Sequence, residues 1–374
     1  IILILLNLLL FSIYANASWT SRDIVRNYRR VQISGDGSTM LAMGDGFKIR
    51  KSTNDGVSWS SLSPSETNGA EYVSMSNDGQ TIVMARGQRI YVSTNGGSSF
   101  TIKDYTMRNY NDIIVSGDGT RAVAVVRDGK IYVSDSPFTS WSEKGVTKRW
   151  IRLAISDDGQ TVLLSDYAYV SANTPQYESN VWRSTDGGDT WAVVKQVHDD
   201  GNAYVMGLTI SGDGNYAYFA NMNGHWCGDV VCRYWYKSTD GGATWGNGIN
   251  AYPMEIKSMA TSTTGKYILA VGDGKTVYLS DNYGVTLTAG THTIAKSVAS
   301  CDMSGDGLKM ILSTYNDNLY THVTAPPTCD ANFFGDSGSC TACPTHSTRV
   351  VGDLASCVDC ACQCLAGHYA TGSG

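Results

Sequence analysis

The stretch Ser34-Gly35-Asp36-Gly37 recurs along the chain in close variants, and its spacing decides the fold. Seven copies begin at Ser34, Ser76, Ser116, Ser156, Ser211, Ser262 (degenerate, Ser-Thr-Thr-Gly) and Ser304. Successive copies are 42, 40, 40, 55, 51 and 42 residues apart. This period is typical of a four-stranded propeller blade, with insertions in the fourth and fifth units. The sequence therefore predicts an all-β fold, a seven-bladed β-propeller of four-stranded antiparallel blades.

The residues around each copy support this interpretation. Apolar residues alternate just before the turn, as at Ile113 and Val115, which is typical of an innermost strand. A second apolar strand follows, for example Thr81 to Ala85. Asp-Gly and Asn-Gly pairs favour the tight hairpin between them, because these residues tolerate positive φ.

A second motif follows the third strand of several units. Ser184-Thr-Asp186-Gly-Gly-Asp-Thr-Trp191 and Ser238-Thr-Asp240-Gly-Gly-Ala-Thr-Trp245 match S-x-D-x-G-x-T-W in full. Ser52 to Trp59, with Asn54 at the acidic position, and Ser93 to Phe100 are conservative variants, while Ser280 to Leu287 and Ser134 to Trp141 are degraded. The polar side chains are expected to bond the turn backbone and the tryptophan to plug the hairpin. We therefore assign structural roles to Asp186, Trp191, Asp240, Trp245, Asn54 and Trp59.

This motif resembles the Asp box (BNR-like repeat) of sialidases, sortilin-type receptors, xyloglucanases and photosystem assembly factors. The resemblance covers about Ser18 to Ala325, implies a β-propeller and selects no function.

The seventh unit has only three candidate strands, Ser297 to Met303, Lys309 to Ser313 and Asn318 to Val323. Ser18-Trp19-Thr20-Ser21 resembles the segments that follow the Asp-box turn. We expect this N-terminal segment to pair with Asn318 to Val323 and close the ring, which removes an exposed sheet edge.

The N-terminus carries an apolar run, Ile1 to Ile13, ending in Ala15-Asn16-Ala17. We interpret residues 1–17 as a signal peptide and the protein as secreted or displayed at the cell surface. The alternative is a membrane anchor, but the run is shorter than the roughly 20 residues that span a bilayer. We expect the sequence to be truncated at both ends. Residues 18–325 are predicted to form the propeller and residues 326–374 the start of a further module.

Ten cysteines suit an oxidising compartment. Cys227 and Cys232 are predicted to form a disulfide in a loop, and Cys301 to be a buried thiol. The seven from Cys329 to Cys364 include two C-x-x-C pairs, whose spacing also fits zinc. The segment resembles ephrin-receptor-like, growth-factor-receptor-like and EGF-like cysteine-rich repeats, and this resemblance implies a small disulfide-rich module.

The net charge of the chain limits the classes of partner that we expect. The formal charge is −6, and no Lys/Arg cluster stands out in the sequence. Nucleic acid is therefore not expected as a partner, nor is membrane insertion within residues 18–374. We expect an extracellular glycan or protein, with self-association or other matrix or filament subunits as further partners.

Ligands of propellers usually bind at the face opposite the Asp boxes, here called the top face. Counting back four residues from each repeat serine yields the expected surroundings of the channel mouth: Arg30, Tyr72, Asp112, Arg152, Gly207, Ser258 and Ser300. Aromatic and polar rim candidates are Tyr110, Trp150, Tyr167, Tyr204, Trp226, Tyr252, His198, His225 and Asp199.

Two function classes stay open. The first, which we favour, is a non-catalytic recognition, adhesion or assembly module. The second is a sialidase-like or other glycoside hydrolase, because arginines, a tyrosine and an aspartate around a propeller mouth resemble a sialidase site. The F-R-I-P segment of that family is absent, and no D-x-D-x-D-G run for calcium occurs. No catalytic residue, cofactor or metal ligand is assigned.

Overall fold

The computed structural model describes residues 18–324 except 63–64, 105, 170–176, 198–203, 222–224, 228–229, 233, 251–254, 273–274 and 295, together with four short strands further on. Contacts divide the chain into Ile1–Val323 and Thr324–Gly374. In the second unit, β32 (Phe333–Asp336) pairs with β33 (Ser339–Ala342), and β34 (Ser347–Thr348) pairs with β35 (Gln363–Cys364). The predicted signal peptide and the tail cysteine side chains lie outside the described residues.

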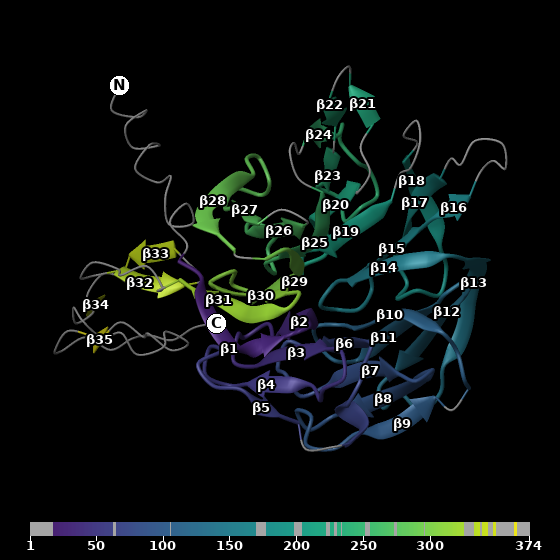
Figure 1. Ribbon diagram of the computed structural model, residues 1–374. Coiled ribbons are helices and arrows are strands. Elements are labelled where there is room, and N and C mark those ends of the chain that lie inside the picture. The colour runs from purple at the N-terminus through teal and green to yellow at the C-terminus, as the bar shows by residue number, and fades with distance from the viewer. Residues whose placement is uncertain are drawn as a thin grey trace. The chain divides into compact units, whose positions relative to one another are not determined.

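Seven antiparallel blades build the first unit, which confirms the predicted propeller (Figure 1). Blades 1 to 3 consist of β2 (Tyr28–Ile33), β3 (Met40–Gly44), β4 (Arg50–Ser52) and β5 (Ser60–Ser61); β6 (Tyr72–Met75), β7 (Ile82–Arg86), β8 (Arg89–Ser93) and β9 (Thr101–Asp104); and β10 (Tyr110–Val115), β11 (Arg121–Val126), β12 (Gly129–Asp135) and β13 (Ser142–Lys148).

Blade 4 carries an extra short strand, β16 (Ala168–Tyr169), and blade 5 an extra hairpin of β21 (His225–Cys227) and β22 (Val230–Cys232). The main strands of blades 4 to 6 are β14 (Trp150–Ile155), β15 (Val162–Asp166), β17 (Tyr177–Ser184) and β18 (Ala192–Val197); β19 (Val205–Ile210), β20 (Ala217–Asn221), β23 (Tyr234–Ser238) and β24 (Ile249–Asn250); and β25 (Ile256–Thr261), β26 (Ile268–Gly272), β27 (Thr276–Ser280) and β28 (Thr288–Thr293).

Blade 7 joins the two ends of the propeller. Its strands β29 (Val298–Met303), β30 (Lys309–Thr314) and β31 (Asp317–Val323) are completed by the N-terminal β1 (Thr20–Arg26). Thr20 pairs with Thr321 and Arg22 with Leu319, so the predicted ring closure is confirmed. Trp19, just before β1, is 6% exposed and packs in the core between blades 6 and 7.

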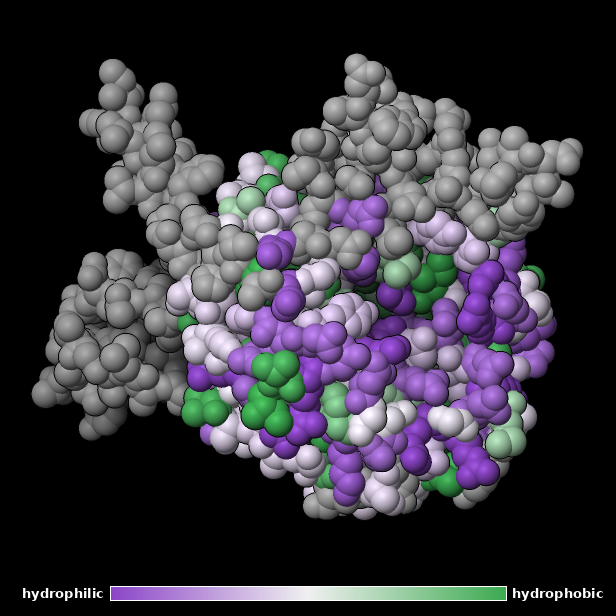
Figure 2. All heavy atoms as spheres, in the orientation of Figure 1, coloured by the Kyte–Doolittle hydropathy of each residue, from purple (hydrophilic) through white to green (hydrophobic). Residues whose placement is uncertain are grey.

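The second strand of each blade is the most buried, because neighbouring blades cover both of its faces. Every residue of β3, β15, β20 and β26 is buried. Outer strands such as β1 and β13 consist of exposed and half-buried residues. Figure 2 shows that the described surface facing the viewer is mainly hydrophilic, with small separate hydrophobic groups.

The seven repeat turns form a closed floor at the bottom of the channel. In each turn but the sixth, the serine hydroxyl bonds the aspartate, as in Ser34 Oγ to Asp36 Oδ1 at 2.6 Å. A main-chain N–H of one turn then bonds a carbonyl of the next, at 2.7 to 3.2 Å. The seven bonds, from N to O, are Asp36 to Asn77, Asn77 to Gly117, Asp118 to Asp157, Asp157 to Gly212, Asp213 to Thr263, Thr263 to Gly305 and Gly305 to Gly35.

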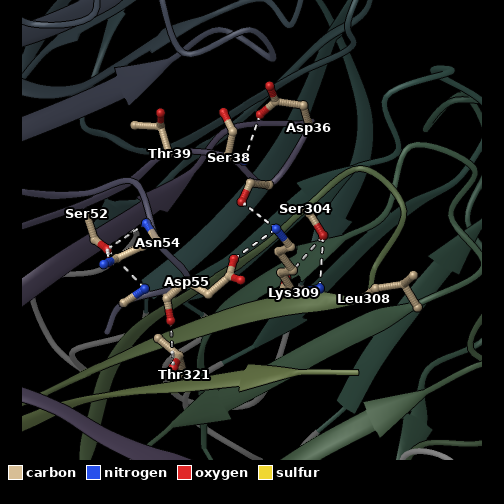
Figure 3. A network of polar contacts seen from close by, with 12 residues as sticks. Asp36, Ser38, Thr39, Ser52, Asn54, Asp55, Ser304, Leu308, Lys309 and Thr321 are labelled. Atoms are coloured by element: carbon tan, nitrogen blue, oxygen red, sulfur yellow. Dashed lines mark hydrogen bonds and ion pairs between the residues drawn. The ribbon is translucent and has the colours of Figure 1, made fainter. Parts of the chain in front are cut away.

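Basic side chains also tie adjacent blades together near the turns. Lys51 donates to the Gly96 carbonyl and Arg183 to the Gly241 carbonyl, both at 2.8 Å. At the closing seam Lys309 of blade 7 donates to Gly37 O at 3.2 Å and pairs with Asp55 Oδ1 at 2.8 Å (Figure 3). The seam between the last and first blades is thus held by side chains as well as by β1.

In the part of the chain that the structure describes, the only helical turn is η1 (Ser65–Thr67). No helix there is long and apolar enough to cross a membrane.

Candidate functional site

Six of the seven residues predicted around the channel mouth line the channel or the hollow above it: Arg30, Tyr72, Asp112, Arg152, Ser258 and Ser300. Arg30, Tyr72, Asp112 and Arg152 each stand four residues before a repeat serine, at the top of an inner strand. Arg30 and Arg152 line both the channel, about 230 Å³, and the wider hollow above it, about 430 Å³. Whether they bind a ligand stays a prediction.

The Asp112 carboxylate is engaged in structural hydrogen bonds and an ion pair. Its Oδ1 accepts a hydrogen bond from Ile113 N at 3.1 Å, and its Oδ2 accepts one from Leu153 N of the next blade at 3.3 Å. Arg30 Nη1 lies 3.4 Å from Oδ1. The carboxylate therefore satisfies inner-strand N–H groups and neutralises one arginine.

Arg152 has a different environment. Its Nε donates to Met206 O and its Nη1 to Ile151 O, both at 3.1 Å. Among the described residues no carboxylate lies within 4.0 Å of its guanidinium. Burial first, and then the charge of Arg30, lower the pKa of Arg152, against the opposing influence of Asp112. A buried cation beside a second cation is costly unless an anion joins them.

Tyr72 separates two hollows of the top face. The Arg30 guanidinium lies over its ring, 4.5 Å from the centroid. Its hydroxyl lies 3.4 Å from Asn111 Oδ1. Burial raises the pKa of Tyr72, and the nearby charge of Arg30 opposes that rise only in part.

Lys257 and Tyr315 also line the upper hollow, and the sequence argument missed them. Lys257 directly precedes Ser258, one of the predicted positions, but alternation along an ideal strand assigns neighbours to opposite sides. Tyr315 lies in the loop between β30 and β31, which the count from the inner strands did not include. The loops between second and third strands also reach the top face, and residues such as Tyr315 can be predicted from them.

Two rim candidates have buried side chains, although Tyr110 also lines a hollow of the top face. Trp150 is fully buried, and its indole Nε1 donates to Gly129 O at 2.9 Å. Tyr110 is 5% exposed, and its hydroxyl bonds Asp104. Tyr110 and Trp150 each lie two residues before a channel residue. A β-bulge between each of them and that channel residue directs their side chains into the core.

The other rim candidates divide into two groups. Tyr204 is half-buried at the top of blade 5, and its ring contacts that of Tyr167 at 4.7 Å between centroids. The remaining candidates have side chains outside the described residues: Trp226, Tyr252, His198, His225 and Asp199.

The Cys227–Cys232 disulfide stays a prediction because both side chains are outside the description. The backbone register places Cys227 opposite Val230 and Cys232 opposite His225. Cys301 is a buried free thiol, as predicted.

Three side chains of the repeat turns pack closely against the glycines of neighbouring turns: Asn77, Asp157 and Thr263. A Cβ added at Gly117 would lie 2.3 Å from Asp157 Oδ1, and one at Gly305 would lie 2.6 Å from Thr263 Oγ1. The same three side chains line the bottom end of the channel.

The S-x-D-x-G-x-T-W turns have the predicted structural geometry. Asp186 Oδ1 accepts from Ser184 Oγ at 2.6 Å and from Thr190 N at 2.9 Å, and Trp191 Nε1 donates to Gly188 O at 2.8 Å. Although burial opposes it, the hydrogen bonds from Ser184 and Thr190 lower the pKa of Asp186 to about 2. The same bonds recur around Asp240 and, with an amide in place of the carboxylate, around Asn54. Trp59 Nε1 donates to Gly56 O at 2.9 Å, and Trp245 packs edge-on against Phe219.

Within the described residues no group of three or more His, Cys, Asp or Glu side chains could hold a metal ion.

Searches with this chain found no matching protein-family model and no matching curated protein. Solved structures do match. Hydrazine synthase of Kuenenia stuttgartiensis is similar with a TM-score of 0.61 at 15% identity, covering 81% of this chain and 97% of that one. YCF48 bound to D1 peptide is similar with a TM-score of 0.59 at 13% identity, covering 82% and 96%. At these identities the likeness concerns the fold.

Proposed function

We propose that the protein is a non-catalytic recognition module that binds an anionic group of its partner in the mouth of the propeller channel. The observation that carries this proposal is Arg152. Its guanidinium is oriented by two carbonyls, lies beside Arg30 and has no carboxylate partner among the described residues. An arginine held in this way is ready to bind an oxyanion through charge-assisted hydrogen bonds.

The lining of the mouth supports an anionic ligand. Four basic side chains line the upper hollow, Arg29, Arg30, Arg152 and Lys257, together with the carboxylates Asp45 and Glu71. With Asp112 of the channel included, this lining has a net charge of +1. Ser258 and Ser300 add hydroxyl groups at the same level. The residues of the upper hollow lie at the top face, so a ligand at that face reaches these basic side chains, whose field attracts anions.

The tyrosine and aspartate of the mouth support binding rather than catalysis. A nucleophilic tyrosine needs an adjacent base or a lowered pKa. Tyr72 instead has an amide oxygen near its hydroxyl and a raised pKa. Asp112 already accepts two main-chain N–H groups and faces Arg30.

A glycoside hydrolase is the second candidate, since Arg30 and Arg152 do converge in one hollow. Turnover of a sialoside or β-glucan that Arg30→Ala, Arg152→Ala or Asp112→Ala abolishes without unfolding would establish it.

The proposed setting is extracellular. This proposal rests on the apolar N-terminal run and the cysteine-rich tail. We propose as well that the protein belongs to the Asp-box propellers. That a similar propeller was solved as YCF48 bound to D1 peptide is consistent with a protein-binding role.

Binding of acidic and neutral probes tests the proposed function. We expect residues 18–374 to bind acidic peptides or acidic oligosaccharides, and Arg152→Met to weaken that binding about tenfold or more. Lys296→Met, on an exposed basic residue between β28 and β29 that lines neither hollow of the top face, is the matched control. Equal binding by wild type and Arg152→Met would contradict the proposal.

A further inference from the structure

A second hollow adjoins the mouth on the top of blades 2 and 3. Its volume is about 580 Å³, and Glu71 and Tyr72 line it as well as the mouth. The other residues used here are Gln88, Asn109, Asn111 and Arg127. The two hollows therefore share one wall.

Side-chain amides dominate the chemistry of this second hollow. Each amide offers two N–H donors and one carbonyl acceptor. Gln88 Nε2 donates to Asn109 Oδ1 at 2.9 Å, which orients both groups. Within the described residues, Gln88 Oε1 and Asn109 Nδ2 make no hydrogen bond, so an acceptor and donors remain for a ligand.

The backbone holds these amides in place. Gln88 has φ +68°, a left-handed conformation that costs a non-glycine residue about 1 kcal/mol. Its carbonyl accepts from Arg108 N at 3.1 Å, and the Asn109 carbonyl accepts from Arg127 N at 2.8 Å. The amide pair is thus presented from two anchored loops.

The charges of the hollow nearly cancel. Glu71 and Arg127 contribute one charge of each sign, in contrast to the basic mouth. Tyr72 supplies an aromatic ring, whereas the Tyr110 ring is buried. The described residues that line the hollow thus present one accessible aromatic ring, whereas protein interfaces typically have a cluster of apolar and aromatic anchors. Paired donors and acceptors without net charge match vicinal hydroxyl groups.

We propose that this hollow binds an uncharged, hydroxyl-rich sugar ring of an oligosaccharide. The inference rests on the proposed function, because it identifies the ligand bound at the top face as a carbohydrate. Gln88 and Asn109 hydrogen-bond the ring hydroxyls, and Glu71 and Arg127 add an acceptor and donors. A neighbouring acidic group of the same glycan then lies in the mouth.

The test compares immobilised neutral and acidic oligosaccharides and acidic peptides as probes for residues 18–374. We expect the wild type to bind neutral oligosaccharides. The variant Gln88→Gly with Asn109→Ala should bind them at least about tenfold more weakly, since two hydrogen-bonding groups are lost. Glycine suits the φ of position 88, so this variant avoids backbone strain. Gln160→Ala, an exposed amide in a bottom turn, is the matched control.

The outcomes separate the two proposals. Arg152→Met should retain neutral-sugar binding while losing acidic probes. Neutral binding without acidic binding in the wild type would overturn the proposed role of the mouth and leave this inference standing. Folded wild-type protein that binds peptides but no neutral oligosaccharide, or a Gln88→Gly, Asn109→Ala variant that binds as tightly as wild type, would overturn the sugar site.

Discussion

The carboxylate of Asp302, on the inner strand of blade 7, accepts a hydrogen bond from Ile33 N, on the inner strand of blade 1, at 2.8 Å. Its other oxygen accepts one from Met303 N at 3.0 Å. The acid thus bridges the two blades that close the ring. Burial raises its pKa from 3.8 to about 7, although both N–H bonds oppose the rise.

A pH dependence of stability follows from Asp302. Its folded pKa lies above its unfolded pKa, so the folded state binds the proton more tightly between about pH 4 and 7. The associated stabilisation is complete below about pH 4 and is lost as the pH rises through 7. We expect urea unfolding to show a decline on the order of 4 kcal/mol over this range, and Asp302→Asn to flatten it. Parallel pH profiles for the two proteins would contradict the assignment.

Ring closure by β1 should depend on Trp19. Trp19→Ala leaves a cavity in the core between blades 6 and 7, where the indole contacts the His322 ring at 5.7 Å between centroids. We expect a loss of about 3 to 5 kcal/mol in the free energy of unfolding. Ile24→Ala, on β1 at 58% exposure, should change it by less than about 0.5 kcal/mol. Similar losses in both variants, measured by chemical denaturation, would show that closure does not rest on the indole.

The blades were predictable because their chemistry is local. Each repeat serine and aspartate forms its own turn, and each S-x-D-x-G-x-T-W segment closes its own hairpin, so spacing alone counts the blades. The site was less predictable, because strand alternation assigns residues two apart to one side. The bulges between Tyr110 and Asp112 and between Trp150 and Arg152 break that rule. The residue types at these positions do not indicate a bulge in the sequence.

The outer turns offer a charge-specific test at Asp186. Asp186→Ala removes the acceptor for Ser184 Oγ, Thr190 N and Thr190 Oγ1, and should cost about 1 to 3 kcal/mol near neutral pH. Because the folded pKa of Asp186, about 2, is below its unfolded value, this stabilisation is present above about pH 4 and fades as the pH falls toward 2. Thr185→Ala, an exposed neighbour, is the control. A cost that persists unchanged at about pH 2 would point to a cause other than the carboxylate.

The close packing of the repeat turns predicts a compensating pair. Gly117→Ala places a Cβ 2.3 Å from Asp157 Oδ1 and 2.4 Å from Asn77 Nδ2, so it should destabilise the propeller by about 1 to 3 kcal/mol. Combining it with Asp157→Gly should recover part of that loss, giving a coupling of about 1 kcal/mol. Strictly additive effects in the double-mutant cycle would mean that the two positions do not share the axial space.

Arg152 should trade stability for binding. Arg152 is half-buried, and its guanidinium lies beside Arg30 without a carboxylate partner in the described part of the chain, an arrangement that costs folding free energy. We therefore expect ligand-free Arg152→Met to unfold at an equal or higher denaturant concentration than wild type, by up to about 1 kcal/mol. Acidic probes that bind the mouth should raise the midpoint of wild type and leave that of Arg152→Met unchanged. Arg121→Met is the contrasting control, because Arg121 bonds Gly187 O and pairs with Asp135 and Asp189, so its loss should destabilise. If Arg152→Met instead unfolds markedly earlier than wild type, Arg152 is a structural tie between blades 4 and 5 and not a binding group.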